Sequence, residues 1–441
     1  SDIMVGGSGD DIFKTYYSAS GTNSTEKFGG EAKIYGGTVT LDGSGNIISS
    51  TASGSDTVDY SAITDTNYSI FADLASEGQS VKIRESSDLN ISIKTDNIYY
   101  INNAIGTSGN DTFRGNANSN ILNGSAGNNT ALYTFTALTA GIVANLQAGE
   151  VEKTTINGTV KDTLINIQNL VGSNFDDSFI TKIGESNIID GGIQGIKGDA
   201  LDYSTNGAIS IVLDLDVTHT TDVYGIGVTN DGTYASVLVN GNSSAMDKIK
   251  NIENIKGSAG ADTIYGNSEN NTIFGMGGND TIYGVSGKNY IDGGAGDDLI
   301  YSGTEADTLF GGTGNDTFRG TTAVSFAGDV IDGGHETDGI NVTGRGSDTV
   351  DYSLVDTTGF SKGLELTLND TVAATVTIDG ANTHTLVNIE NIIGTSHNDS
   401  IVGDGGNNTL IGGTGADTIR GTAGNNVIYG DNENGSEANI A

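Results

Sequence analysis

The sequence predicts an all-β solenoid with inserted β-strands, and three observations lead to this fold class. A polar residue and an apolar residue return every nine positions through residues 257–319, the 441-residue chain contains 67 Gly and no Pro, and no stretch keeps a helical period. An α-helix repeats its apolar positions every 3.6 residues and an isolated strand every second residue. A period of nine therefore indicates a chain that coils and buries the same position in each coil.

The nine-residue period does not slip in this block. The polar series is Asp262, Asn271, Asp280, Asn289, Asp298, Asp307 and Asp316. The apolar series, two positions later, is Ile264, Ile273, Ile282, Ile291, Ile300, Leu309 and Phe318. The first six positions of each repeat are rich in Gly, which tolerates the dihedral angles of tight turns. We expect each repeat to form a turn and then a short strand, whose middle side chain points into a thin core.

The charge is strongly acidic. The chain has 56 Asp and Glu against 19 Lys and Arg, a net charge of −37. Nucleic acid is a poor partner for such a chain, because binding it requires clustered basic residues. There is no Cys to form a disulfide, and no apolar run approaches the length of a membrane span. Disorder is the alternative for an acidic chain, but the strict apolar period favours carboxylates that neutralise a bound cation.

A larger module recurs about four times above the nonapeptide, and we place modules at 1–113, 114–179, 180–330 and 331–441. Each contains a strand phrase such as "GSDTVDYS" at 54–61, an alternating insertion such as "AISIVLDLDV" at 208–217, and a closing phrase such as "NIENIKGSAGADTI" at 251–264. The insertions read as short strands and hairpins. The chain opens in mid-repeat, so we expect it to be a processed or excised part of a longer protein.

The nonapeptide resembles a known repeat. The best matches are "GGTGNDTFR" at 311–319, "GGAGDDLIY" at 293–301, "GGTGADTIR" at 412–420 and "GGSGDDIFK" at 6–14. They are similar to G-G-x-G-x-D-x-U-x, the calcium-binding nonapeptide of the repeats-in-toxin (RTX) family. The resemblance implies a parallel β-roll in which two nonapeptides make one coil, so that residues eighteen apart stack as adjacent strands, about 4.8 Å apart.

Calcium suits these residue types, because it takes six to eight oxygen ligands and a turn can offer carbonyl oxygens beside the Asp at position six. Sorting by eighteen puts four Asp residues on one edge, with a Gly at position four of each turn. These are Asp262, Asp280, Asp298 and Asp316, with Gly260, Gly278, Gly296 and Gly314. The opposite edge carries Asn271, Asn289 and Asp307. We predict several calcium ions between the turns of the first edge and weak or no sites on the second.

Other candidate ligands lie outside this block. Asp399 and Asp417 share one edge of the C-terminal repeats, opposite Asn408 and Asn426. We also include Asp307 among the candidate ligands. The remaining candidates sit in matching phrases without a clear partner eighteen residues away, so that ligand and simple turn residue are equal alternatives for them; they are Asp11, Asp111 and Asp177.

Two further sequence patterns bear on function. Aromatic residues at position nine predict ladders, which either stack on themselves or form an assembly or glycan-binding surface. The ladder residues are Tyr265, Tyr283 and Tyr301 on one face and Phe274 and Phe310 on the other. The phrase "GFSKG" at 359–363, with Asp379 and His384 downstream, has hydrolase-like order but no strand-to-helix context. We therefore expect no nucleophile at Ser361 and no enzyme.

The expected function is that of a secreted, calcium-dependent structural protein similar to the repeat regions of bacterial surface-layer proteins and large RTX adhesins. It would fold on binding calcium outside the cell and self-associate into a lattice or fibre. Members of the family typically leave through type I secretion. The alternative is an accessory or secretion segment of an RTX enzyme whose catalytic domain lies elsewhere. Ice binding is discounted, because "GTGND" occurs only at 312–316.

Overall fold

A computed structural model describes most of the chain as short β-strands. The described residues are 2–15, 31–41, 47–52, 54–75, 79–193, 195–222, 226, 228–320, 326–334, 346–355, 357–369 and 372–431. Their one helical element is the single 3₁₀ turn η1 (Ser204–Asn206). Two compact units are present, residues 1–201 with 247–252 and residues 202–246 with 253–441. The predicted all-β solenoid of nonapeptide repeats is confirmed, whereas the boundaries of the four modules stay a prediction.

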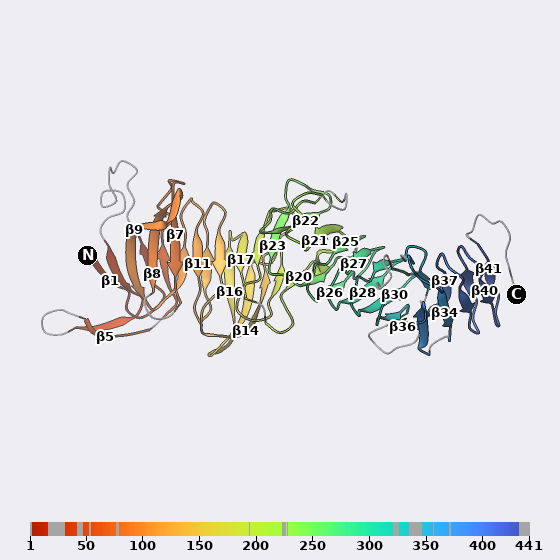
Figure 1. The fold of residues 1–441 in the computed structure, drawn as a ribbon. Coiled ribbons are helices and arrows are strands. Elements are labelled where there is room, and N and C mark those ends of the chain that lie inside the picture. Colours follow the sequence, from red (N-terminus) through yellow and green to blue (C-terminus); the bar gives the residue numbers. More distant parts are fainter. Residues whose placement is uncertain are drawn as a thin grey trace. The chain divides into compact units, whose positions relative to one another are not determined.

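The N-terminal unit consists mainly of two sheets (Figure 1). In pairing order, the first sheet contains β1 (Asp2–Val5), β3 (Ala32–Tyr35), β9 (Asp88–Tyr99), β8 (Ser80–Glu85), β7 (Tyr68–Asp73), β11 (Thr112–Arg114), β13 (Thr130–Leu132), β17 (Asn169–Val171), β19 (Ile188–Asp190) and β23 (Asp247–Lys250). The second contains β2 (Ile12–Lys14), β6 (Asp56–Asp59), β10 (Ile101–Ile105), β12 (Ile121–Asn123), β16 (Gly158–Ile165), β15 (Glu150–Thr155), β14 (Leu138–Asn145), β18 (Ser178–Ile180) and β20 (Ala200–Asp202). A separate antiparallel pair is formed by β4 (Thr38–Leu41) and β5 (Ile47–Thr51).

The C-terminal unit repeats the two-sheet arrangement. Its first sheet contains β22 (Ala235–Val239), β21 (Ile211–Asp214), β25 (Thr263–Tyr265), β27 (Thr281–Tyr283), β29 (Leu299–Tyr301), β31 (Thr317–Arg319), β33 (Thr349–Asp351), β37 (Asn391–Ile393), β39 (Thr409–Ile411) and β41 (Val427–Tyr429). Its second contains β24 (Asn254–Lys256), β26 (Thr272–Phe274), β28 (Tyr290–Ala295), β30 (Thr308–Thr313), β32 (Val330–Asp332), β36 (Asn382–Val387), β35 (Ala374–Ile378), β34 (Leu364–Thr367), β38 (Ser400–Val402) and β40 (Thr418–Arg420).

The register explains the nine-residue period. Successive nonapeptides alternate between the two sheets, with β25 and β27 in one and β26 and β28 in the other (Figure 1). Where no insertion intervenes, each strand pairs in parallel with the strand eighteen residues on, as Ile264 pairs with Ile282 and Ile273 with Ile291. The middle side chains of the strands face inward, and all seven members of the apolar series are fully buried. The thin core is therefore one apolar side chain per strand, repeated along the stack.

The insertions lie within the sheets. Three of them are three-stranded antiparallel meanders, β7–β8–β9, β14–β15–β16 and β34–β35–β36. The outer strands of each meander pair in parallel with the neighbouring coils, as β16 does with β12 and β14 with β18. Each insertion thus widens a sheet by antiparallel strands while the coil continues on both sides. Among the described residues, no helix has the length and apolar character of a membrane span.

Candidate metal-binding turns

The acidic turns of the C-terminal unit lie at two edges. We call the turns that lead into its first sheet the first edge, and those that lead into its second sheet the second edge. The first edge contains the turns that end at Asp262, Asp280, Asp298 and Asp316, each directly before a strand of the first sheet. Parallel pairing of β25, β27, β29 and β31 stacks these turns in a column. The structure therefore brings together the four Asp residues that the eighteen-residue sorting groups.

Glycine at position four lets the turns stack closely. Gly278, Gly296 and Gly314 have positive φ angles of 103°, 134° and 126°. A Cβ on Gly296 would lie 1.9 Å from the carbonyl oxygen of Gly278, and one on Gly314 would lie 2.0 Å from that of Gly296. Gly260 lies beside the hairpin strand β21 instead, where its Cβ would be 2.0 Å from the carbonyl oxygen of Ile209. Any other residue at Gly278, Gly296 or Gly314 would be strained and would clash with the neighbouring turn.

A hydrogen bond from each turn to the next uses one oxygen of the Asp side chain. The main-chain N–H of Asp262 donates to Oδ1 of Asp280, and that of Asp280 donates to Oδ1 of Asp298, both at 2.8 Å. The series continues past the predicted block, because the N–H of Asp316 donates to Oδ1 of Asp348 at 2.8 Å. The Oδ1 atoms thus hold successive turns in register.

The second oxygen is left without a donor in a subset of the turns. Their Oδ2 atoms are buried and accept no hydrogen bond from the part of the chain that the structure describes; they belong to Asp11, Asp56, Asp280, Asp298, Asp307, Asp316 and Asp329. A buried carboxylate without a full set of partners is costly, and it either takes up a proton or binds a cation. These atoms mark the turns at which a bound cation would stabilise the fold most.

The pKa values of the three carboxyl groups in the first-edge column, Asp280, Asp298 and Asp316, show the same cost. Burial, followed by the charges of neighbouring carboxylates, raises the pKa of Asp280 to about 8 and that of Asp316 to about 7. Burial also raises the pKa of Asp298 to about 7, to which Asp292 and Asp297 contribute. A divalent cation would favour the ionised form and remove the repulsion along the column.

A second class of acidic turn satisfies its own Asp. In these turns residue two is Ser or Thr: its N–H donates to Oδ2 of the Asp, and its hydroxyl lies within hydrogen-bond distance of Oδ1. The pairs are Thr107–Asp111, Ser173–Asp177, Ser258–Asp262 and Thr395–Asp399. Burial raises the pKa of Asp262 and of Asp399 to about 6, and the hydrogen bonds oppose this rise.

Each Asp of this class also anchors an insertion. Oδ1 accepts the main-chain N–H of a residue at the start of the insertion, at 2.5–2.7 Å; the pairs are Ile70–Asp111, Ile142–Asp177, Ile211–Asp262 and Leu364–Asp399. Both carboxyl oxygens are therefore occupied. Four of the residues predicted as metal ligands stand in turns of this kind, where the protein itself supplies the hydrogen-bond donors. We call these the capped turns. We call the turns whose Asp has an Oδ2 without a donor among the described residues, such as those of Asp280, Asp298 and Asp316, the open turns.

The second edge changes character along the C-terminal unit. At its start the Asn271 N–H donates to Oδ1 of Asn289, and the amide nitrogen of Asn289 donates to turn carbonyls of Gly284 and Ser286. The edge then becomes acidic at Asp307, whose N–H donates to Oδ1 of Asp329 at 2.8 Å. Burial raises the pKa of Asp307 to about 7 and that of Asp329 to about 8. Asparagine amides thus fill turns whose sixth residue carries no charge.

Beyond Glu390 the acidic residues at position six are on the second edge. Asp399 and Asp417 stand before β38 and β40, and the Asp399 N–H donates to Oδ1 of Asp417 at 2.9 Å. On the first edge Asp348 is followed by Glu390, whose Oε2 accepts the Asp348 N–H at 2.8 Å. Asn408 and Asn426 come next on the first edge. The acidic edge therefore changes sides near residue 390.

Sequence reasoning missed the partners that lie across an insertion. The Asp11 N–H donates to Oδ1 of Asp56, forty-five residues away, and the Asp177 N–H donates to Oδ1 of Asp199, twenty-two residues away. Asp111, in contrast, has a neighbour at eighteen residues, because its N–H donates to Oδ1 of Asn129. The missed residues do carry a signal, since each is followed two positions later by a buried apolar residue; they are Asp56, Asp199, Asp329 and Asp348.

Comparison with known protein families identifies these turns. The RTX calcium-binding nonapeptide repeat matches residues 1–14, 99–131, 252–282, 283–318, 393–428 and 411–434. The repeats of this chain are RTX repeats. The RTX repeats bind calcium, and the matched segments include both open and capped turns. No curated protein matches the chain.

The open turns fit calcium. Within the described ranges, no three His, Cys, Asp or Glu side chains converge to hold a metal. An RTX turn would therefore supply one carboxylate, with main-chain carbonyl oxygens of stacked turns completing the ligand set of a hard cation. Asp280, Asp298 and Asp316 offer the buried Oδ2 atoms for this purpose. Bound calcium supplies the positive charge that the column lacks.

The predicted aromatic residues form a ladder on each of the two sheets. Tyr265, Tyr283 and Tyr301 stack with centroids 4.1 and 4.3 Å apart. On the second sheet Tyr290 lies between Phe274 and Phe310, at 5.7 and 5.3 Å. The ladders therefore stack on themselves.

The three residues of the hydrolase-like phrase do not form a relay. Ser361 Oγ donates to Asp379 at 2.9 Å, whereas His384 is buried with Nε2 2.5 Å from the hydroxyl of Tyr352.

Proposed function

We propose that the chain is an extracellular, calcium-dependent structural protein, a building block of a bacterial cell-surface layer, an extracellular fibre or a large adhesin. The observation that carries the proposal is the column of Asp280, Asp298 and Asp316. Their buried Oδ2 atoms have no donor among the described residues, and their raised pKa values reflect the cost of ionising them without a cation. A stack of this kind gains stability where calcium is abundant, because calcium binding adds to the free energy of unfolding.

Secretion follows from the same argument. RTX-repeat proteins are typically secreted through type I systems, and turns that fold only on binding calcium would stay unfolded in the calcium-poor cytosol. The net charge of −37 opposes compaction until cations neutralise part of it. We propose that calcium outside the cell completes the fold.

The assembly role is supported by the way the coils add. Each coil pairs with the next through main-chain hydrogen bonds of parallel strands, as β39 does with β41. Strand pairing of this kind can also join the coils of two copies. That the aromatic ladders bind a cell-surface glycan stays a prediction from the sequence.

We propose no enzymatic role for the described residues. The alternative function is an accessory segment of an RTX enzyme, and the matched repeats favour it as much as they favour a structural protein.

Light scattering during a calcium titration of metal-stripped protein tests the proposal. Growth into large particles that chelator reverses would support a lattice or fibre. A compact monomer at millimolar calcium would support the accessory segment. A chain that stays equally compact with and without calcium would overturn calcium-dependent folding. The triple variant Asp280→Asn, Asp298→Asn, Asp316→Asn should need more calcium for each transition, whereas Asp297→Asn, at an exposed neighbouring position, should behave as wild type.

A further inference from the structure

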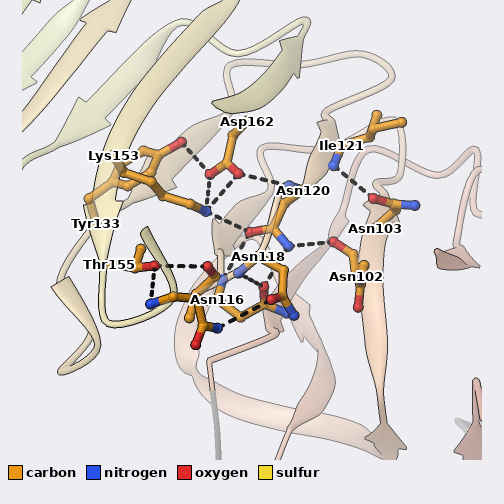
Figure 2. Close-up of polar contacts among 12 residues, drawn as sticks. Asn102, Asn103, Asn116, Asn118, Asn120, Ile121, Tyr133, Lys153, Thr155 and Asp162 are labelled. Atoms are coloured by element: carbon orange, nitrogen blue, oxygen red, sulfur yellow. Dashed lines mark hydrogen bonds and ion pairs between the residues drawn. The ribbon is translucent and has the colours of Figure 1, made fainter. Parts of the chain in front are cut away.

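A lysine ammonium group is fully buried in the turn region of the N-terminal unit. Lys153 stands on β15, the middle strand of the meander β14–β15–β16, and its side chain is 0% exposed. Its Nζ lies 2.6 Å from each carboxylate oxygen of Asp162, also 0% exposed, and 3.0 Å from Oδ1 of Asn120 (Figure 2). The charged group is therefore surrounded by oxygens, as a metal ion would be.

Asn120 and Asp162 occupy position six of two successive coils. Asn120 directly precedes β12, and Asp162 lies within β16 directly before Thr163, which pairs in parallel with Ile121. The Asn120 N–H donates to Oδ1 of Asp162 at 2.7 Å, and the Thr163 N–H donates to the Asn120 carbonyl at 2.8 Å. The same two bonds join the open turns of Asp298 and Asp316, with the Thr317 N–H donating to the Asp298 carbonyl. Lys153 thus contacts the position-six side chains of both coils. In an open turn, the carboxylate at this position has an oxygen without a donor among the described residues.

The other partners of Asp162 complete a satisfied site. Its Oδ2 accepts the hydroxyl of Tyr133 at 3.1 Å (Figure 2). The ring centroids of Tyr133 and Phe135 lie 6.0 and 5.5 Å from Nζ, within reach of cation–π attraction. Burial lowers the pKa of Lys153 and raises that of Asp162, and the attraction between the two charges opposes both shifts. With all donors and acceptors paired, the ion pair is the stable form.

A second lysine repeats the arrangement. Lys94 Nζ lies 3.0 Å from Oδ2 of Asp96, and both side chains are buried. Asp96 Oδ2 accepts the hydroxyl of Tyr60 at 2.8 Å, and Oδ1 accepts the Ala32 N–H at 2.9 Å. Tyr60 comes just after β6, as Tyr133 comes just after β13.

The C-terminal unit has a neutral version of the same site. Tyr352, just after β33, contacts His384 at position six of its own insertion, and burial lowers the pKa of that ring to about 3.

We propose that the ammonium group of Lys153 is the built-in cation of the Asn120–Asp162 turn pair and that Lys94 serves Asp96 in the same way. The coils completed by these two insertions would then fold without calcium. Removing calcium would unfold the open turns of Asp280, Asp298 and Asp316 and leave β12, β15 and β16 formed. The chain would thus combine metal-dependent and metal-independent coils.

Hydrogen exchange with mass spectrometry on the full chain tests the proposal directly. In metal-stripped protein we expect amides of β12, β15 and β16 to exchange within about twofold of their calcium-bound rates, and those of β27, β29 and β31 to exchange at least about a hundredfold faster. A comparable loss of protection in both sets would overturn the proposal. This comparison uses the unmodified protein, so it does not depend on whether a variant folds.

Variants then test the role of the ammonium group. Lys153→Met keeps the chain length and leaves Asp162 buried without its cation, so protection of β12, β15 and β16 without calcium should fall at least about tenfold. Lys161→Met is the matched control, because Lys161 pairs with Glu150 on the exposed face of the neighbouring strand. The double variant Lys153→Met, Asp162→Asn should recover most of the protection. Unchanged protection in Lys153→Met without calcium would overturn the proposal.

Discussion

The main-chain N–H of Asp298 donates to Oδ1 of Asp316 at 2.8 Å, although the two residues are eighteen positions apart. The bond leaves Oδ2 of Asp316 buried and without a donor among the described residues. One carboxyl group therefore has two tasks, since Oδ1 aligns successive turns and Oδ2 is available to a cation. Calcium bound at Oδ2 would therefore stabilise the same turns that Oδ1 aligns.

Asp298→Asn should weaken calcium binding while the turns stay aligned. The amide can still offer an oxygen to the Asp280 N–H, which now donates to Oδ1 of Asp298. It replaces the charged Oδ2 by a neutral donor, so calcium affinity at the adjoining sites should fall on the order of tenfold. Isothermal calorimetry would measure the affinity and the number of ions bound.

The matched control for this substitution is Asp297→Asn. It removes the same charge one residue away, at an exposed position whose Oδ1 accepts the Asn315 N–H. Its calcium affinity should stay within about twofold of wild type, because exposed charges are screened. Equal losses in the two variants would mean that net charge, and not the buried column, governs calcium binding.

The metal-free chain should become less stable as the pH rises from about 4 to 8. The carboxyl groups of Asp280, Asp316 and Asp348 have pKa values of about 8, 7 and 8 in the folded chain, above the usual value near 3.8. The folded state thus binds more protons than the unfolded state across this range, and its stability is present at low pH and lost as pH passes the folded pKa values. Thermal unfolding of metal-stripped protein at pH 5 and pH 8 would show a higher midpoint at pH 5.

Calcium should reverse this order, because the metal binds the ionised carboxylates. With saturating calcium the midpoint at pH 8 should exceed that at pH 5. A metal-free midpoint that rises with pH would contradict the assignment of these groups as uncompensated buried carboxyls.

The sequence predicts the coil far better than it predicts which turns stay open. The nine-residue period identifies the inward residue of each strand from Ile264 to Phe318, because one inward side chain per strand leaves no ambiguity in register. It cannot identify Asp348 as the neighbour of Asp316, because thirty-two residues separate them and the length of an insertion is not periodic.

The sequence also fails to predict the capped turns and the buried ammonium group, for a different reason. Ser258 in place of the second Gly reads as an ordinary turn substitution, although it supplies the donors that occupy Asp262. Lys153 stands in an alternating insertion, where an exposed side chain is the usual expectation for lysine. Its burial depends on the contact between the middle strand and two coils, which no local pattern encodes.

Gly278→Ala should destabilise the stack with or without calcium. Gly278 has φ of +103°, and an added Cβ would lie 2.5 Å from the carbonyl carbon of Gly260 in the turn below. The positive φ alone costs about 1 kcal/mol for alanine, and the close backbone contact adds to this, so a loss of about 1–3 kcal/mol is expected. Chemical denaturation in saturating calcium would measure it.

The adjacent residue provides the control for this glycine. A Cβ on Gly277 would meet nothing closer than the carbonyl oxygen of Ala295 at 3.7 Å, and its φ is not positive. Gly277→Ala should therefore be neutral or slightly stabilising, because alanine restricts the unfolded chain. Equal effects of the two substitutions would show that the turns do not stack as closely as described.

Thr395→Val should loosen an insertion without changing calcium binding. The Thr395 hydroxyl donates to Oδ1 of Asp399 at 2.8 Å, and the same oxygen accepts the Leu364 N–H at the start of β34. Valine keeps the shape but removes the donor, so the local stability should fall by about 1–3 kcal/mol. Hydrogen exchange in β34 should accelerate accordingly, whereas Thr395→Ser, which retains the hydroxyl, should exchange at nearly the wild-type rate. Since the Asp of a capped turn has both oxygens occupied by the protein, the acceleration should be the same in saturating calcium as in metal-stripped protein. If calcium restored the protection in Thr395→Val, Asp399 would be a metal ligand and the distinction between capped and open turns would fail.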